Sequence, residues 1–135
     1  MLPNEIFKIV ISYIKFNDLI KLVKLSSQID KLIKTMQIYD NIIIINTECL
    51  KYLANYKIYS CDICDCYITD DEFKYLSKFV KIKFCEYEYN ACKFFTEITG
   101  AGFVHLKQCK KIEIGLCQNL NNEYYKYLNH CKHVT

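Results

Sequence analysis

Three closely spaced cysteines form the most metal-like cluster of this sequence. Cys61, Cys64 and Cys66 lie within a stretch of six residues, and thiolates at this spacing could share a zinc ion with Cys49 or with a C-terminal histidine. No second Cys-x-x-Cys pair follows at the spacing of a zinc finger, and cysteine is often buried as a small apolar residue. We therefore expect structural cysteines, no metal and no cofactor, with metal binding by these three residues as the alternative.

Catalysis by a cysteine nucleophile would need a histidine within hydrogen-bond reach and an Asn or Asp that orients it. Of the three histidines, His105 falls inside a repeated pattern and is expected to flank a helix. His130 and His133 lie among the last six residues, and chain ends seldom hold side chains rigidly. The sequence therefore predicts no enzymatic activity and no catalytic residues.

Composition limits the classes of partner. Of the 135 residues, 52% are hydrophobic and 24% are charged, which is typical of a packed globular chain. All 18 basic residues are lysines and the net charge is only +3, so the bidentate arginine contacts that read bases and grip phosphates are missing. The longest apolar run, Ile42–Ile45, is far shorter than the roughly 20 residues of a membrane span. We expect neither a nucleic-acid partner nor a membrane partner.

The cysteine count also bears on the compartment. The chain has nine cysteines, an odd number, and polar Asn4, Glu5 and Lys8 interrupt what would have to be the apolar part of a signal peptide. We expect reduced thiols and a cytoplasmic location, in the host cytoplasm or nucleus if the protein is viral.

A repeated pattern must position whatever function the chain has. Four segments each carry an aliphatic residue, Asn or Thr, three variable residues, a large apolar residue, one variable residue, Tyr or His, and Leu. Their last leucines lie 23, 30 and 22 residues apart, and they are Leu53, Leu76, Leu106 and Leu128.

Each repeat predicts a strand followed by a short helix. Thr69, Thr99 and Asn121 are residue types that cap helix N-termini, and Glu72 completes a capping box with Thr69. Upstream, Ile112-Glu-Ile114 alternates with the period of a half-buried strand. One such unit cannot bury its apolar face alone, but stacked copies can. The sequence therefore predicts an α/β fold built from stacked units.

The repeat resembles the cysteine-containing leucine-rich repeats of F-box proteins. One unit carries that pattern in Cys109, Ile112, Ile114, Cys117, Leu120, Asn121 and Asn122, and another in Ile63, Cys66, Ile68, Thr69 and Asp70. A third unit departs from it, because extra residues fall between Phe84 and Ile98. The resemblance implies a short leucine-rich-repeat (strand–helix) solenoid over residues 41–135, with four units of which the last is incomplete.

Residues 1–40 have a helical period instead, and Asn17-Asp18 and Ser27 mark the starts of a second and a third helix. This segment resembles an F-box in four stretches, which are Leu2-Pro3-Asn4-Glu5-Ile6, Val10 to Ile14, Asp18-Leu19 and Leu22 to Ser26. The fold expected for the whole chain is an N-terminal F-box-like three-helix segment followed by the short solenoid.

Together the two resemblances imply a non-enzymatic, substrate-recruiting adaptor of a Skp1–cullin–F-box ubiquitin ligase. The surface for a Skp1-like partner would comprise Leu2, Pro3, Ile6, Val10, Ile14, Leu19 and Leu22. The surface for an unknown substrate protein would comprise Lys83 and Glu113 on strands, and Glu86, Tyr87 and Tyr89 in the aromatic-rich insertion. The insertion could instead be a partly buried loop.

The alternative is a stand-alone leucine-rich-repeat module for protein binding whose N-terminal helices only cap the solenoid, as terminal repeats require. Burial of Ile6, Val10 and Ile14 against the first repeat would favour the cap. An exposed apolar patch at these residues would favour the adaptor.

Overall fold

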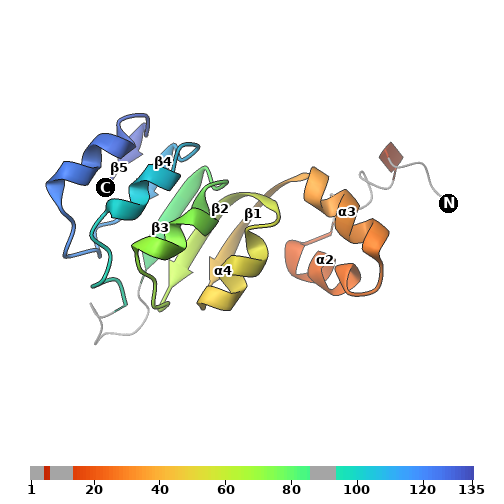
Figure 1. Ribbon diagram of the computed structural model, residues 1–135. Coiled ribbons are helices and arrows are strands. Elements are labelled where there is room, and N and C mark those ends of the chain that lie inside the picture. Colours follow the sequence, from red (N-terminus) through yellow and green to blue (C-terminus); the bar gives the residue numbers. More distant parts are fainter. Residues whose placement is uncertain (1–4, 7–13, 86–93) are drawn as a thin grey trace.

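The computed structural model describes residues 5–6, 14–85 and 94–135. Helices α2 (Phe16–Val23) and α3 (Ser27–Thr35) precede a five-stranded sheet. Figure 1 shows the two helices beyond the β1 side of this sheet, and short helices along one of its faces.

The sheet places its strands in chain order, and every neighbouring pair is parallel. The strands are β1 (Gln37–Ile44), β2 (Lys57–Cys64), β3 (Lys81–Cys85), β4 (Lys111–Glu113) and β5 (His133–Val134). Parallel neighbours need a crossover that returns the chain to the starting end of the sheet. Four short helices provide these crossovers, namely α4 (Thr47–Leu53), η1 (Asp70–Leu76), η2 (Ala101–His105) and η3 (Asn122–Leu128). The prediction of a mixed α/β fold is confirmed.

A single core lies between the inner face of the sheet and the crossover helices. Strand residues such as Ile58, Ile82 and Ile112 are buried there. The four leucines that anchor the repeats, Leu53, Leu76, Leu106 and Leu128, are all buried in the same cluster. Full burial of one leucine contributes about 1.5–3 kcal/mol. These four equivalent leucines therefore stabilise the packing of successive repeat units in one shared core.

The helix starts agree with the sequence in part. Asn46, Thr69 and Asn121 are N-caps whose side chains accept backbone N–H groups, and Thr69 with Glu72 forms the predicted capping box. The prediction for Thr99 is wrong, because the N-cap of η2 is Gly100, at a φ of 102°. Only glycine adopts this left-handed backbone without strain.

The caps of the N-terminal helices also differ from the prediction. Lys15 is the N-cap of α2 and makes no side-chain cap bond, so Asn17-Asp18 lies inside the helix. Ser26 caps α3 by accepting the N–H of Ile29. Strand β1 begins at Gln37, upstream of the apolar run that predicted a strand.

A buried tyrosine joins α3 to the first repeat. The hydroxyl of Tyr56 donates to Asp30 Oδ1 at 2.8 Å and lies 3.1 Å from the hydroxyl of Tyr52. Lys34 Nζ lies 2.8 Å from the other oxygen of Asp30. Burial, followed by the bonds to Tyr52 and Asp30, raises the pKa of Tyr56. Since Ile33 belongs to the same core, the helices close the β1 end of the sheet.

Asp70 links η1 to the start of η2. Its Oδ2 accepts from the N–H of Thr99 at 2.9 Å and from Thr99 Oγ1 at 2.7 Å, and its Oδ1 accepts from the N–H groups of Gly100 and Gly102 at 3.0 Å. A Cβ on Gly102 would lie 2.6 Å from the carbonyl oxygen of Asp70, so only glycine fits this approach. Burial raises the pKa of Asp70, but the bonds from Thr99, Gly102 and Gly100 outweigh it and leave the pKa lowered.

The first prediction concerns this link. Asp70→Ala should lower the free energy of unfolding by about 1–3 kcal/mol, because it leaves the N–H groups of Gly100 and Gly102 without their acceptor. Chemical denaturation monitored by circular dichroism measures the change. Asp71→Ala is the matched control, because Asp71 is exposed and adjacent, and it should stay near wild type.

The Asp70 carboxylate should also make the stability of the folded protein depend on pH in the acid range. Because the folded pKa of Asp70 is lowered, its contribution is present above about pH 4 and is lost as the pH falls through the folded value. Asp70→Asn should therefore lose less stability than wild type on acidification. An equal loss of stability in both proteins as the pH falls would contradict this role of Asp70.

Candidate functional site

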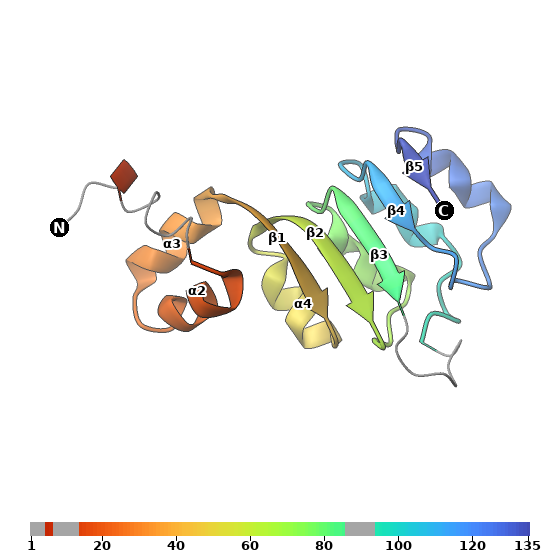
Figure 2. The same ribbon diagram turned by 180° about the vertical axis from the view of Figure 1, so that it is seen from behind.

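In the described part of the chain, no helix covers the face of the sheet opposite the crossover helices (Figure 2). Along β1, buried Ile42 and Ile44 alternate with exposed Asn41 and Ile43, and along β3 buried Ile82 and Phe84 alternate with exposed Lys81 and Lys83. We call this surface the outer face; its residues are Tyr39, Asn41, Ile43, Tyr59, Ser60, Asp62, Lys81, Lys83, Lys111, Glu113 and His133.

Strand register arranges the outer face in two rows. The first row runs Asn41, Ser60, Lys81, Lys111 and His133, and the second runs Ile43, Asp62, Lys83 and Glu113. Adjacent positions in a row are about 4.8 Å apart, the spacing of paired strands. Side chains from residues that are distant in sequence therefore form one continuous surface.

The β1–β2 part of the outer face is aromatic and polar. Ser60 Oγ donates to Asn41 Oδ1 at 2.9 Å, and the rings of Tyr39 and Tyr59 lie 5.6 Å apart. Lys81 Nζ lies 5.5 Å from the centre of the Tyr59 ring, in reach of a cation–π contact. Tyr39 remains 73% exposed and Ile43 53% exposed. Exposed aromatic and apolar side chains of this kind are typical of surfaces that contact another protein.

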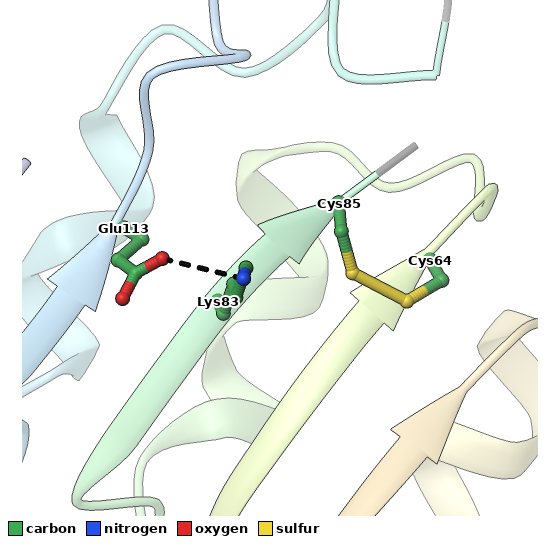
Figure 3. Close-up of a disulfide and its surroundings, with 4 residues drawn as sticks. All are labelled: Cys64, Lys83, Cys85 and Glu113. Atoms are coloured by element: carbon green, nitrogen blue, oxygen red, sulfur yellow. Dashed lines mark ion pairs between the residues drawn. A yellow bond between two sulfur atoms is a disulfide. The ribbon is translucent and has the colours of Figure 1, made fainter. Parts of the chain in front are cut away.

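The β3–β4 part carries paired charges. Glu113 lies 3.0 Å from Lys111 Nζ and 3.7 Å from Lys83 Nζ, and Figure 3 shows the second pair across the two strands. The hydrogen bond from Lys111 and then the charges of both lysines lower the pKa of Glu113. Lys83 and Glu113, which the sequence assigned to substrate binding, thus lie together on the outer face.

The other residues assigned to a substrate surface, Glu86, Tyr87 and Tyr89, lie outside the described residues. Tyr39, Tyr59, Lys81 and Lys111 also lie on the outer face, and no sequence pattern assigned them to a binding surface. A register irregularity between Ile38 and Asn41 interrupts the simple alternation that would have assigned the two tyrosines to this face.

The residues assigned to a Skp1-like partner separate into three groups. Leu19 is buried, and Ile14 and Leu22 are partly buried against the core. Ile6 is 46% exposed. Leu2, Pro3 and Val10 lie outside the described residues.

The cysteines that the structure describes lie at separate places in the fold. Cys64 and Cys85 occupy paired positions on β2 and β3 and form a disulfide (Figure 3). Cys61 lies on the inner face, and its burial raises the pKa of the thiol. Within the described ranges, no three His, Cys, Asp or Glu side chains lie close enough together to hold a metal ion.

The disulfide corrects the expectation of reduced thiols for two of the cysteines. Cys64 and Cys85 are 21 residues apart, close to one repeat length, so they reach equivalent positions on adjacent strands. That spacing was the available sequence signal, because residues one repeat apart become neighbours in the sheet.

His130 lies between a backbone carbonyl and a thiol. Nε2 of His130 lies 2.7 Å from the carbonyl oxygen of Leu106 and 3.9 Å from Sγ of Cys131. Burial raises the pKa of Cys131, the opposite of what a thiolate nucleophile needs.

Comparisons with protein-family models, curated proteins and solved structures return no match to this chain. Among the described residues, no helix is both long enough and apolar enough to span a bilayer.

The second prediction follows from the disulfide. Closing a loop of this length is worth about 3 kcal/mol in the chain-entropy account, so a thiol reductant should lower the melting temperature of the wild type. Cys64→Ser combined with Cys85→Ser should melt at one temperature with or without reductant. The control Cys49→Ser removes a thiol that is not disulfide-bonded and should keep the wild-type response; an unchanged wild-type melting temperature would contradict the prediction.

Proposed function

We propose that this chain is a short leucine-rich-repeat solenoid whose first unit is closed by F-box-like helices, and that it binds another protein through the outer face. Three features support the solenoid. The parallel strands follow one another in chain order, the crossover helices share one face (Figures 1 and 2), and the anchor leucines share one core.

The observation that carries the binding function is the composition of the uncovered outer face. Exposed Tyr39 and Ile43 lie beside hydrogen-bonding Asn41 and Ser60. Burying such a mixture against a partner gains apolar contact while its polar groups find new bonds. The raised pKa of the Cys131 thiol, which lies beside His130, favours a binding module over an enzyme.

The third prediction tests this surface. Selection of a random peptide library on the immobilised full chain should enrich peptides that bind the wild type. Tyr39→Ser combined with Ile43→Ser should weaken these peptides at least tenfold, equivalent to about 1.4 kcal/mol, because exposed apolar anchors dominate such contacts. Fluorescence anisotropy measures the affinities.

The matched control is Val104→Ser combined with Tyr127→Ser. Both side chains are exposed, at 40% and 37%, and they lie on η2 and η3 in the helical layer. This variant should bind the peptides within twofold of wild type. Equal losses in the two variants, or no enriched peptide, would contradict binding through the outer face.

A second candidate is the adaptor of a Skp1–cullin–F-box ubiquitin ligase in the cytoplasm. Ile6 and Leu25 favour it, because these apolar side chains of the N-terminal segment are 46% and 81% exposed. In this proposal buried Leu19 supports the helices from inside, the exposed residues contact Skp1, and the outer face holds the substrate. The burial of Leu19 and the Tyr56–Asp30 bond favour the simpler capping function.

The fourth prediction distinguishes the adaptor from the capped binding module. If the chain is an adaptor, Leu2→Asp combined with Ile6→Asp abolishes co-purification with Skp1 and leaves the circular dichroism nearly unchanged. Peptide binding by the outer face should survive in this variant. Wild-type Skp1 binding by the variant, or none by the wild type, would remove the adaptor and leave the capped binding module.

A further inference from the structure

Lysines and acidic residues are distributed unevenly between the two ends of the strands. The four turns that lead from a helix into the next strand, residues 53–58, 76–82, 106–112 and 128–134, contain lysines and no Asp or Glu. The turn from β2 to η1, residues 64–70, has acidic residues and no lysine. Because all strands run in one direction (Figure 2), the lysines gather at their starting ends. We call this region the basic end; it comprises Lys57, Lys78, Lys81, Lys107, Lys110, Lys111 and Lys132.

Little within the described residues neutralises the basic end. Of its seven lysines, Lys111 alone has an ion pair with a described carboxylate, that of Glu113. Lys81 instead lies over the ring of Tyr59. The remaining charges face solvent, and such a cluster attracts anionic groups.

Two of these lysines oppose each other directly. Lys81 and Lys111 are register partners on β3 and β4, and His133 continues the row on β5. Like charges in directly opposed cross-strand positions destabilise a sheet. Helix dipoles explain lysines in last helical turns, such as Lys74 and Lys126, but not this strand row. Glu113 and the Tyr59 ring offset part of this cost, and an anionic partner on the open face would meet both lysines at once.

The second row of the outer face contains two carboxylates, and these favour some anionic partners over others. Asp62 and Glu113 lie two residues further along β2 and β4, and the Glu113 carboxylate pairs with Lys111 and Lys83. A continuous polyphosphate would be repelled by Asp62 and would compete with Glu113 for the lysines, whereas a protein segment can vary its charge from residue to residue. Tyr39 and Tyr59 add the aromatic surface typical of protein contacts.

We infer that the outer face binds an extended acidic segment of a protein partner, whose carboxylates meet Lys81 and Lys111 of the basic end. This inference rests on the proposed function and specifies the partner's chemistry. The segment's acidic residues pair with the two lysines, and its other residues contact Tyr39 and Tyr59.

The fifth prediction uses the peptides selected on the full chain. They should be enriched in Asp and Glu, and Lys81→Glu combined with Lys111→Glu should weaken them at least tenfold in 150 mM salt by fluorescence anisotropy. Lys74→Glu combined with Lys126→Glu changes the net charge equally but lies in the helical layer, so it should bind within twofold of wild type. Lys81→Gln combined with Lys111→Gln should show an intermediate loss, and circular dichroism checks that each variant is folded.

Three results would overturn the inference. Enriched peptides without acidic residues that still depend on Tyr39 and Ile43 would leave the proposed function standing and reject the acidic partner. An absence of enriched peptides would reject both. A 12-nucleotide single-stranded DNA that binds as tightly as the peptides, with the same loss in Lys81→Glu with Lys111→Glu, would identify a nucleic-acid surface instead.

Discussion

One strand and one short helix cannot exclude water from both sides of an apolar side chain, and this constraint shapes the whole sheet. Leu76, for example, is buried only because neighbouring units lie on either side of it. Stacking repeats the same strand direction and the same crossover, so the helices cover one face and leave the other open. The open face is therefore a consequence of how the core is enclosed, and the function proposed here uses it.

The first unit needs a neighbour as much as the others do. At β1 that neighbour is the pair α2 and α3, which brings Ile33 into the common core and fixes α3 through the bond from Tyr56 to Asp30. The helices thus have a sufficient structural purpose, and any contact with Skp1 would depend on the residues that packing leaves exposed, such as Leu25.

Features governed by neighbouring residues could be predicted well. The capping box of Thr69 and Glu72 depends on residues three positions apart, and the burial of Ile112 and Ile114 follows from alternation along one strand. The start of η2 could not be predicted, because it depends on Asp70, which lies 30 residues before Gly100. Of the outer face, Lys83 and Glu113 alone were assigned from the sequence; Tyr39 and Tyr59 were not, because the register irregularity of β1 has no clear mark in the sequence.

The sequence by itself determined the repeat, its strand–helix alternation and the leucines of the core, because hydrophobic period and helix caps act over a few residues. Tertiary structure decided which side chains meet across strands, namely the disulfide of Cys64 with Cys85 and the opposed lysines 81 and 111, and it decided that Leu19 of α2 is buried in the core. The physical reason is register. A strand pairing sets every cross-strand neighbour at once, and packing of the whole chain, not any local segment, selects the pairing.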